Sequence, residues 1–580
     1  RPREQDTSII SRLAKSTMLI RALPIIAFFW AHIVIFHTLP GILVTGVSGN
    51  LHALPVLGVA VVCVAVPHIF GAWGIIPLTI TNFAYLVLRG SVSNHILTEL
   101  CLCAAVAASA FAAFTGGAKE GTERRMQNTL GECFRKQLAA LYLISALHKM
   151  NTGFFEIRTS CSSQIIAITT LQLLPEWIAK PILTSSPLLQ TAPAGGLFLE
   201  ILMGLGLLSG SPSVRRGTIV VAQLFHIVLA LPLPPSSFYP FSAICSFAFI
   251  PLHPEACSNV FHRSKKGLLL AFLLVLWPLL TYRCYGQREK EYPPYSQYPA
   301  GVGWIMCLAF INVAAATIYP SNGDMRAGKT PQVQYEKERE EATKREEIHQ
   351  SSSSSSKDGK SHKTGRQNIS KEHLGSSSTP PPPRGRILSA PNVMFALVFM
   401  IGLTPYAGMR TYPAFAMFSN LQTEDRSNHW FLPGWRSWNH RPSYLEPVKI
   451  VETDLRSLHA FQVDLSPYYP EETLEGLAEI DLEAALWVCP PKWKFRLPEF
   501  VPYHIPFFEL NKAVVTALDN NKDPFYVKYQ RNGQTKTLTR LPSGECTGEE
   551  AERLLQPPPF WQRLFFRFRS FDPESNVCRH

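Results

Sequence analysis

Long runs of apolar residues, separated by short polar stretches, fill residues 1–320 of the chain. A helix needs about 20 mostly apolar residues to cross the hydrocarbon core of a bilayer. Runs that approach this length predict spans at Met18–Leu39, Ala53–Phe70, His95–Phe114, Lys136–Met150, Gly196–Ser209, Thr218–Leu233, Phe238–Leu252, Leu268–Tyr282, Gly301–Tyr319 and Ile387–Pro405. The pattern therefore predicts an α-helical multi-pass membrane bundle of about ten to eleven spans.

Two shorter apolar stretches decide how the chain threads the membrane. Ile76–Leu88 is either a short span or a re-entrant piece, while prolines and a glutamate break Ile165–Ile182, which we expect to lie at the interface. If only the first stretch crosses, the basic clusters fall on one side, as the positive-inside rule requires; they are Arg1–Arg21, Lys119–Lys136, Arg215–Arg216 and Arg263–Lys266. Asn151 and everything after Pro405 then lie on the opposite, non-cytosolic side.

Composition supports a membrane protein and excludes a nucleic-acid binder. Only 17% of residues are charged, against about 25% in an average soluble protein. The net charge of +12 comes from basic residues that are scattered between apolar runs, whereas a nucleic-acid binder gathers them on one face. Met18–Leu39 is too long for the core of a signal peptide and is predicted to be the first anchor.

The chain divides into four predicted regions. Residues 1–320 form the transmembrane domain, residues 321–386 a disordered linker rich in Ser, Pro and charge, residues 387–405 the last span, and residues 406–580 a small lumenal α+β domain. In the last region, strand-like pieces occur at Val448–Val451, Phe461–Asp464, Phe525–Tyr529 and Gln534–Leu538. An Asn-Gly pair between the final two predicts a hairpin.

The twelve cysteines show no spacing typical of a metal site. Cys101 and Cys103 lie in an apolar helix, where burial as small hydrophobic residues is expected. Cys489, Cys546 and Cys578 would face an oxidising lumen, where two of the three could form one disulfide.

Ionisable groups within apolar runs are the candidates for function, because they are costly in a bilayer. Each has a structural alternative: Lys149 could reach the interface, His95 could be interfacial, Glu200 could tie two spans together, and His226 could pack between helices. The functional interpretation rests on lysine chemistry. A lysine at the edge of a dry cavity is disfavoured as ammonium, and once neutral it can act as a general base.

These residues carry a resemblance to a known membrane family. Tyr142–Asn151 (YLISALHKMN) resembles the segment of vitamin-K-dependent gamma-glutamyl carboxylases that ends in the catalytic lysine, and Asn94-His95 resembles the family's Asn-His pair. Leu197–Ile201, Arg215–Gly217, Phe225-His226 and Phe238–Pro240 then follow the family's next pattern in order. The wider grouping is the horizontally transferred transmembrane (HTTM) domain. Thr411–Glu424 with Asn428-His429 is similar to a segment of HTTM proteins from microbes and algae.

The resemblance implies an activity and a role for each candidate residue. In the family, the lysine deprotonates vitamin K hydroquinone, oxygen converts the quinol anion to a strong base, and a substrate glutamate loses a γ-proton and adds carbon dioxide. Lys149 would be the base and His95 would assist at the carbanion or carbon dioxide step. Four further residues would bind the quinol or line its cavity; they are Asn94, His148, Glu200 and His226.

Two departures keep a second hypothesis open. The lumenal region is shorter than that of the animal enzyme, and the Ser/Pro linker before the last span has no counterpart there. The first hypothesis is thus a carboxylase-like enzyme that uses vitamin K hydroquinone or a related quinol, oxygen, carbon dioxide and a protein or peptide glutamate. The alternative is a non-catalytic HTTM scaffold or a subunit of a larger membrane complex. The expected location is the endoplasmic reticulum or another endomembrane, or an organellar inner membrane.

Overall fold

The computed structural model describes most of the helical part of the chain and most of a C-terminal sheet. The described residues are 22–45, 48–65, 71–88, 93–115, 121–157, 160–185, 187–232, 238–254, 256–257, 260, 294–318, 389–416, 419–423, 427–432, 443–459, 502–520 and 523–571. The predicted span Leu268–Tyr282, the linker at 321–386, the strand Phe461–Asp464, Cys489 and Cys578 lie outside them.

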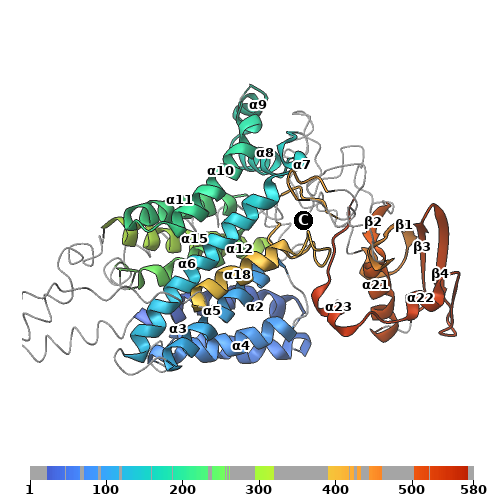
Figure 1. Cartoon of the computed structure of the whole chain (residues 1–580), viewed down its shortest axis with the longest axis horizontal. Coiled ribbons are helices and arrows are strands. Elements are labelled where there is room, and N and C mark those ends of the chain that lie inside the picture. The colour runs from blue at the N-terminus through green and yellow to red at the C-terminus, as the bar shows by residue number, and fades with distance from the viewer. Residues whose placement is uncertain are drawn as a thin grey trace, which may run out of the picture. The chain divides into compact units, whose positions relative to one another are not determined.

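The described residues from α2 to α18 are almost entirely helical (Figure 1). The longer helices are α2 (Ala22–Thr45), α3 (Leu54–Ala65), α4 (Ile75–Leu88), α5 (Asn94–Thr115), α6 (Thr122–Lys149), α10 (Leu188–Leu208), α11 (Pro212–Ala230), α12 (Tyr239–Ala248), α15 (Pro294–Ile318) and α18 (Ala390–Leu403). Among the described helices, α5, α10 and α11 are long and apolar enough to cross a bilayer, and several others are shorter apolar helices. The prediction of a mostly helical chain with a small C-terminal sheet is confirmed.

Helix α6 begins much earlier than the apolar run predicted. Its first turns, from Thr122, carry most of the basic cluster Lys119–Lys136. These turns are amphipathic: Met126, Leu130 and Phe134 are buried, while Asn128 and Glu132 between them are exposed. The apolar content of a window underestimates such a helix, because only one of its faces is buried.

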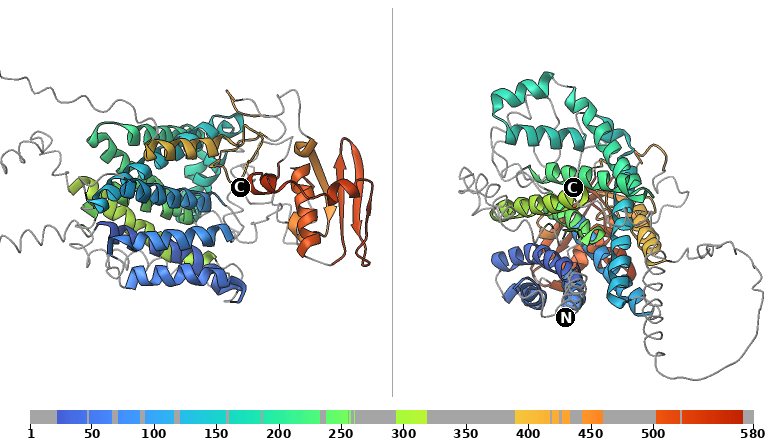
Figure 2. Two further views of the ribbon diagram at one scale, coloured as in Figure 1. Left: turned by 60° about the horizontal axis from the view of Figure 1, so that its bottom comes forward. Right: turned by 90° about the vertical axis from the view of Figure 1, so that its left-hand side faces the viewer.

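Helix α6 is the central element of the helical part, since α5, α10 and α18 all pack against it (Figure 1). Glycines allow two of these close approaches. A Cβ on Gly204 of α10 would lie 2.6 Å from Leu143 Cγ, and a Cβ on Gly402 of α18 would clash with Ile144. Small residues let the helix backbones come together in this way. Figure 2 shows α2, α3 and α4 grouped beside α5.

The chain that follows α18 completes the C-terminal end of α6. The last carbonyl groups of a helix have no partner within it. His429 Nε2 donates to Leu147 O at 2.8 Å, Asn151 Nδ2 donates to His148 O at 2.8 Å, and Trp430 N donates to Met150 O at 3.0 Å. The predicted 406–580 region therefore begins with a segment that binds the helices, and its first strand starts only at Pro447.

The interfacial stretch predicted at Ile165–Ile182 forms two helices. Helix α8 (Cys161–Leu173) ends just before Pro175, and α9 (Glu176–Ser185) follows it directly. Proline disfavours helical geometry in the preceding residue, which explains the break. Cys161, at the start of α8, is disulfide-bonded. Cys546 is free, and Cys489 and Cys578 lie outside the described residues, so the pairing of two of these three cysteines stays a prediction.

The C-terminal sheet is antiparallel and has the strand order β2-β1-β3-β4-β5. Its strands are β1 (Pro447–Thr453), β2 (Tyr503–Pro506), β3 (Phe525–Arg531), β4 (Gln534–Arg540) and β5 (Cys546–Gly548). Asn532 and Gly533 form the two-residue turn between β3 and β4, with φ of 50° and 78°. The hairpin predicted from Asn-Gly is confirmed, because both residues adopt the positive φ that a type I′ turn requires.

Helix α21 (Phe507–Asn520) supplies the other half of the sheet's core. Alternate residues of β3, Phe525, Val527 and Tyr529, are buried, and they pack with Leu510 and Val514 of the helix. This alternation is the two-residue period of a strand with one covered face.

Candidate functional site

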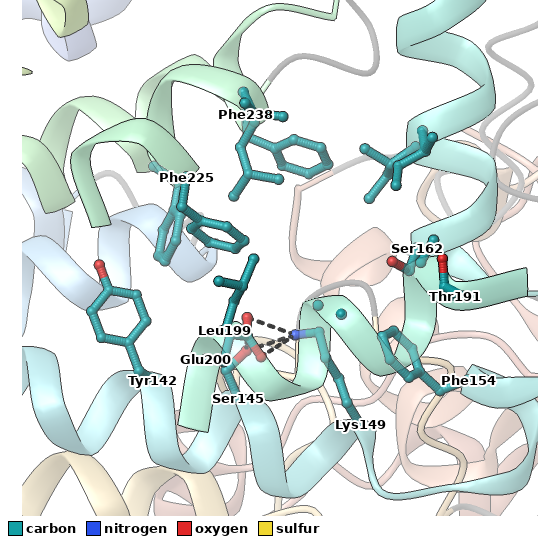
Figure 3. Close-up of a pocket in the computed structure, with 18 of the residues that line it drawn as sticks. Tyr142, Ser145, Lys149, Phe154, Ser162, Thr191, Leu199, Glu200, Phe225 and Phe238 are labelled. Atoms are coloured by element: carbon teal, nitrogen blue, oxygen red, sulfur yellow. Dashed lines mark hydrogen bonds and ion pairs between the residues drawn. The ribbon is translucent and has the colours of Figure 1, made fainter. Parts of the chain in front are cut away.

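An apolar cavity of about 340 Å³ lies beside α6 in the helical part (Figure 3). Its lining is mostly aliphatic and aromatic, and it comes from α6, α7 (Thr152–Phe155), α8, α10, α11, α12 and the segment after α18. The residues labelled in Figure 3 are Tyr142, Ser145, Lys149, Phe154, Ser162, Thr191, Leu199, Glu200, Phe225 and Phe238. The volume falls in the range of about 300–1,000 Å³ that is typical of small-molecule sites.

Lys149 and Glu200 form a buried ion pair in the wall of this cavity. Lys149 Nζ lies 2.9 Å from Glu200 Oε1 and donates to Ser145 Oγ at 2.8 Å. Only 9% of the Lys149 side chain and 8% of the Glu200 side chain are exposed. The ammonium group therefore points at a carboxylate of α10, and not toward the end of its own helix as the interfacial alternative required.

One carboxylate oxygen of Glu200 accepts no hydrogen bond. Oε2 is also 2.9 Å from Lys149 Nζ, but the geometry does not make a hydrogen bond, and Oε2 has no hydrogen-bond partner among the described residues. A buried polar atom without a partner is unusual and costs stability. Because Glu200 lines the cavity, a hydroxyl group of a ligand could donate to this oxygen.

Tyr142 and His226 form a second polar pair behind the cavity. Tyr142 lines the cavity, and its hydroxyl lies 2.7 Å from His226 Nε2 on α11. His226 is fully buried, and its Nδ1 has no hydrogen-bond partner among the described residues. His226 thus reaches the cavity only through Tyr142, as a group that orients the phenol.

Asn94 and His148, which the resemblance assigned to the quinol cavity, do not line it. Asn94 Oδ1 accepts a hydrogen bond from Phe415 N at 3.0 Å. His148 Nε2 lies 3.2 Å from Ala414 O, and its Nδ1 lies 3.0 Å from the hydroxyl of Tyr406. Both residues hold the chain that follows α18.

His95 lies apart from the lysine. It is half-buried at the first turn of α5, where Ser93 Oγ lies 2.9 Å from its Nδ1. It is not among the residues that line the cavity. Of the six candidates, the structure brings Lys149 and Glu200 into direct contact, places His226 one residue behind them, and leaves His95 outside.

Most residues that line the cavity were not predicted as site residues, among them Tyr142, Ser145 and Phe415. Spacing along α6 could have identified the first two, because residues three, four and seven positions before Lys149 share its helix face. Phe415 follows α18, more than 260 residues after Lys149, and no local pattern could have placed it there.

Comparisons with protein-family models, curated proteins and solved structures give no match for this chain.

Proposed function

We propose that this protein is a membrane enzyme that binds a lipophilic quinol in the cavity beside α6 and removes a proton from it with Lys149. The observation that carries the proposal is the Lys149–Glu200 ion pair in an otherwise apolar cavity, with one carboxylate oxygen left without a hydrogen bond. Such a site suits a ligand that is apolar over most of its surface and carries a hydroxyl group at one end.

The outer surface of the helices supports a membrane location. Phe198, Leu202 and Leu205 of α10 are 62%, 44% and 57% exposed. They recur at intervals of three and four residues, which places them on one face of the helix. A continuous exposed apolar face is rare on a soluble monomer, so we assign this face to lipid.

The residues present fit a quinol such as vitamin K hydroquinone, the substrate that the family resemblance implies. Phe154, Phe225 and Phe238 offer aromatic surface to a fused ring and its isoprenoid tail, and Glu200 Oε2 can accept from a ring hydroxyl. Bound there, the quinol would supply the reducing power that couples oxygen to carboxylation.

The proton of the quinol can pass to Lys149 or to Glu200, and both routes give the same final charges. If Lys149 is neutral and Glu200 is protonated, the amine takes the proton of the quinol. If the pair is an ammonium and a carboxylate, Glu200 takes it. Both routes end with an ammonium and a carboxylic acid facing a quinolate anion. The Lys149 ammonium then stabilises that anion, and it does so more strongly than in water because the cavity is apolar.

The full proposed reaction is the carboxylation of a glutamate side chain. Quinol, oxygen, carbon dioxide and glutamate give quinone epoxide, γ-carboxyglutamate, water and a proton, so that one oxygen atom enters the epoxide and the other the water. The quinol is oxidised and oxygen is reduced. The glutamate exchanges a γ-proton for a carboxylate.

A non-catalytic relative that keeps the scaffold is the second candidate, and the position of His95 favours it. The resemblance implies that this histidine assists carboxylation, yet it does not line the cavity. In this second candidate the Lys149–Glu200 pair would bind a lipophilic alcohol or quinol without converting it.

One experiment separates the two candidates. Purified protein in lipid nanodiscs is incubated with reduced phylloquinone, oxygen, labelled bicarbonate and a glutamate-containing peptide, and the products are measured by mass spectrometry. The enzyme yields quinone epoxide and a carboxylated peptide. Saturable binding of phylloquinone without epoxide identifies the scaffold, and the absence of both rejects the quinol site.

A further inference from the structure

A single peptide group near the cavity is held at both of its polar ends. The amide between Ala414 and Phe415 accepts at its oxygen from His148 Nε2, at 3.2 Å, and donates its N–H to Asn94 Oδ1, at 3.0 Å. Both side chains that hold it are buried, with Asn94 5% and His148 0% exposed. The amide is therefore fixed between α5 and α6, the two helices that carry these residues.

The hydrogen bonds also fix the tautomer of His148. A carbonyl oxygen can only accept, so Nε2 must carry the proton. In the neutral imidazole, Nδ1 is then the acceptor, and the hydroxyl of Tyr406, 3.0 Å away, donates to it. Tyr406, His148, the amide and Asn94 thus form one continuous chain of hydrogen bonds, which we call the clamp.

The residue that the clamp fixes has an unusual backbone. Phe415 has φ of +59°, a left-handed conformation that is rare for a bulky residue and is found where the surrounding structure imposes it. Its side chain is 3% exposed, and it is one of the residues that line the cavity. The clamp therefore holds a strained residue that forms part of the cavity wall.

We propose that Phe415 limits the width of ligand that the cavity admits, and that Asn94 and His148 act on ligand selection only by positioning it. The proposal rests on the cavity of the proposed function being the ligand site, and it does not depend on which ligand binds. It gives Asn94 and His148 a positioning role in place of the direct quinol contact that the resemblance implied.

A thiol reporter tests the proposal without any quinol. Ser145 lines the cavity next to Lys149, so Ser145→Cys in the full-length protein reports access to that part of it. The labelling rates of narrow N-methylmaleimide and wide N-(1-pyrenyl)maleimide are compared, and the parent protein gives the background. We expect Phe415→Ala to raise the wide-to-narrow ratio about tenfold, the scale of discrimination that small volume changes give in an apolar pocket. An unchanged ratio overturns the proposal.

The positioning role is tested by a double-mutant cycle. Asn94→Ala should raise the ratio when Phe415 is present and add nothing in the Phe415→Ala background. Asn94→Asp keeps an oxygen acceptor and should preserve the parent ratio. Phe225→Ala is the matched control, because it removes another lining ring that the clamp does not hold; there Asn94→Ala should keep its full effect. Additive effects of Asn94→Ala and Phe415→Ala contradict the positioning role.

Two further observations keep the outcomes distinct. If Asn94→Ala fails to fold, Phe415→Gly, which suits a positive φ, still tests the wall on its own. A protein that shows the expected ratios but does not bind phylloquinone in nanodiscs rejects the proposed function and retains this inference. A protein that binds phylloquinone but whose wide-to-narrow labelling ratio does not change in Phe415→Ala rejects this inference and retains the proposed function.

Discussion

Two buried ion pairs, one beside the cavity and one in the C-terminal sheet, differ in how completely their polar atoms are satisfied. In the helical part, Lys149 and Glu200 face an apolar cavity, and Glu200 Oε2 has no hydrogen-bond partner among the described residues. In the sheet, Arg531 lies between Glu446 and Glu550. Its guanidinium group also packs 4.2 Å from the centre of the Phe507 ring.

In the sheet, the carboxylate of Glu550 is bound by three side chains. Glu550 binds Arg531 at 3.0 Å, accepts from the Tyr529 hydroxyl at 3.0 Å, and pairs with Lys536 at 3.1 Å. Burial by itself raises the pKa of Glu550, but the hydrogen bond from Lys536 and the charge of Arg531 outweigh it and hold the pKa below its ordinary value. This is how a buried charge is kept in a structural role.

The difference between the two sites teaches where to look for function among buried charges. A buried charge whose partners are complete does a structural task, because no atom remains for a ligand. A buried ion pair that faces a cavity and leaves one oxygen without a hydrogen bond costs stability that the fold alone does not recover. The incomplete pair is therefore the better candidate for a site.

The largest effect expected is on turnover, from changes to Lys149. Lys149→Ala should lower quinol epoxidation by about 10²–10⁴-fold, the usual contribution of a general base. Lys149→Arg should fail as well if Lys149 accepts the proton, because guanidinium stays protonated, and it should keep activity if Glu200 accepts it. Epoxide is measured by mass spectrometry. The matched control is Lys136→Ala on the same helix, which removes a lysine that pairs with Asn392 outside the cavity and should leave turnover near the parent value. Full activity of Lys149→Arg would exclude Lys149 as the base.

The next effect is on stability, in the sheet. Arg531→Met removes the cation between Glu446 and Glu550. Glu446 is 28% exposed and Glu550 keeps Lys536, so the cost should be about 1–3 kcal/mol, below that of breaking a fully buried pair. Hydrogen exchange of the β3–β4 amides in the full-length protein should report this loss. Lys528→Met, on the same strand but only half-buried, serves as the control and should have a small effect. Phylloquinone binding should not change in either variant. A loss of binding would contradict a purely structural role for the sheet network.

Changes to the incomplete pair should weaken binding, and replacing both of its members at once should cost no stability. Glu200→Gln should weaken phylloquinone binding by about 10–100-fold, because a hydrogen bond to a charged group contributes about 1.5–3 kcal/mol. The double variant Lys149→Met with Glu200→Leu should be as stable as the parent or more so, since apolar residues often replace a buried pair without loss. Thermal unfolding and equilibrium binding measure the two effects. A double variant that is stable and still binds phylloquinone would mean that the pair contributes neither to folding nor to ligand binding.

The smallest effect concerns pH. Since the pKa of Glu550 is lower in the folded protein than its ordinary value of 4.5, its contribution to stability is complete above that value. It is lost as the pH falls through the folded pKa, because the unfolded chain then binds the proton more readily. Acid unfolding of the sheet should therefore become less pH-dependent below about pH 4.5 in Glu550→Gln. An identical acid profile in the variant would remove Glu550 from the network.

The sequence predicted the elements better than it predicted the site. Apolar runs placed the helices, and Asn532-Gly533 placed the β3–β4 hairpin, because both signals are local. Lys149 and Glu200 were identified as costly groups in apolar helices. Their direct contact could not be predicted, since it depends on how α6 packs against α10.

The contacts of the chain after α18 could not be predicted from the sequence either. Asn94 and His148 were expected in the cavity, and they instead hold the amide of Phe415. The motif that contains Phe415 was noted, but a sequence motif does not say which helix end a distant segment will bind. Long-range hydrogen bonds of this kind are set by tertiary packing alone.

The most direct measurement of the central claim is to locate the ligand. Purified protein in nanodiscs is photolabelled with a diazirine-bearing naphthoquinone, and the labelled peptides are identified by mass spectrometry with and without excess phylloquinone. The account predicts label on the peptides of α6, α8 and α10 that line the cavity, removed by competition and reduced in Lys149→Ala. Label confined to lipid-facing positions such as Phe198 and Leu205, or label that phylloquinone does not displace, would contradict it.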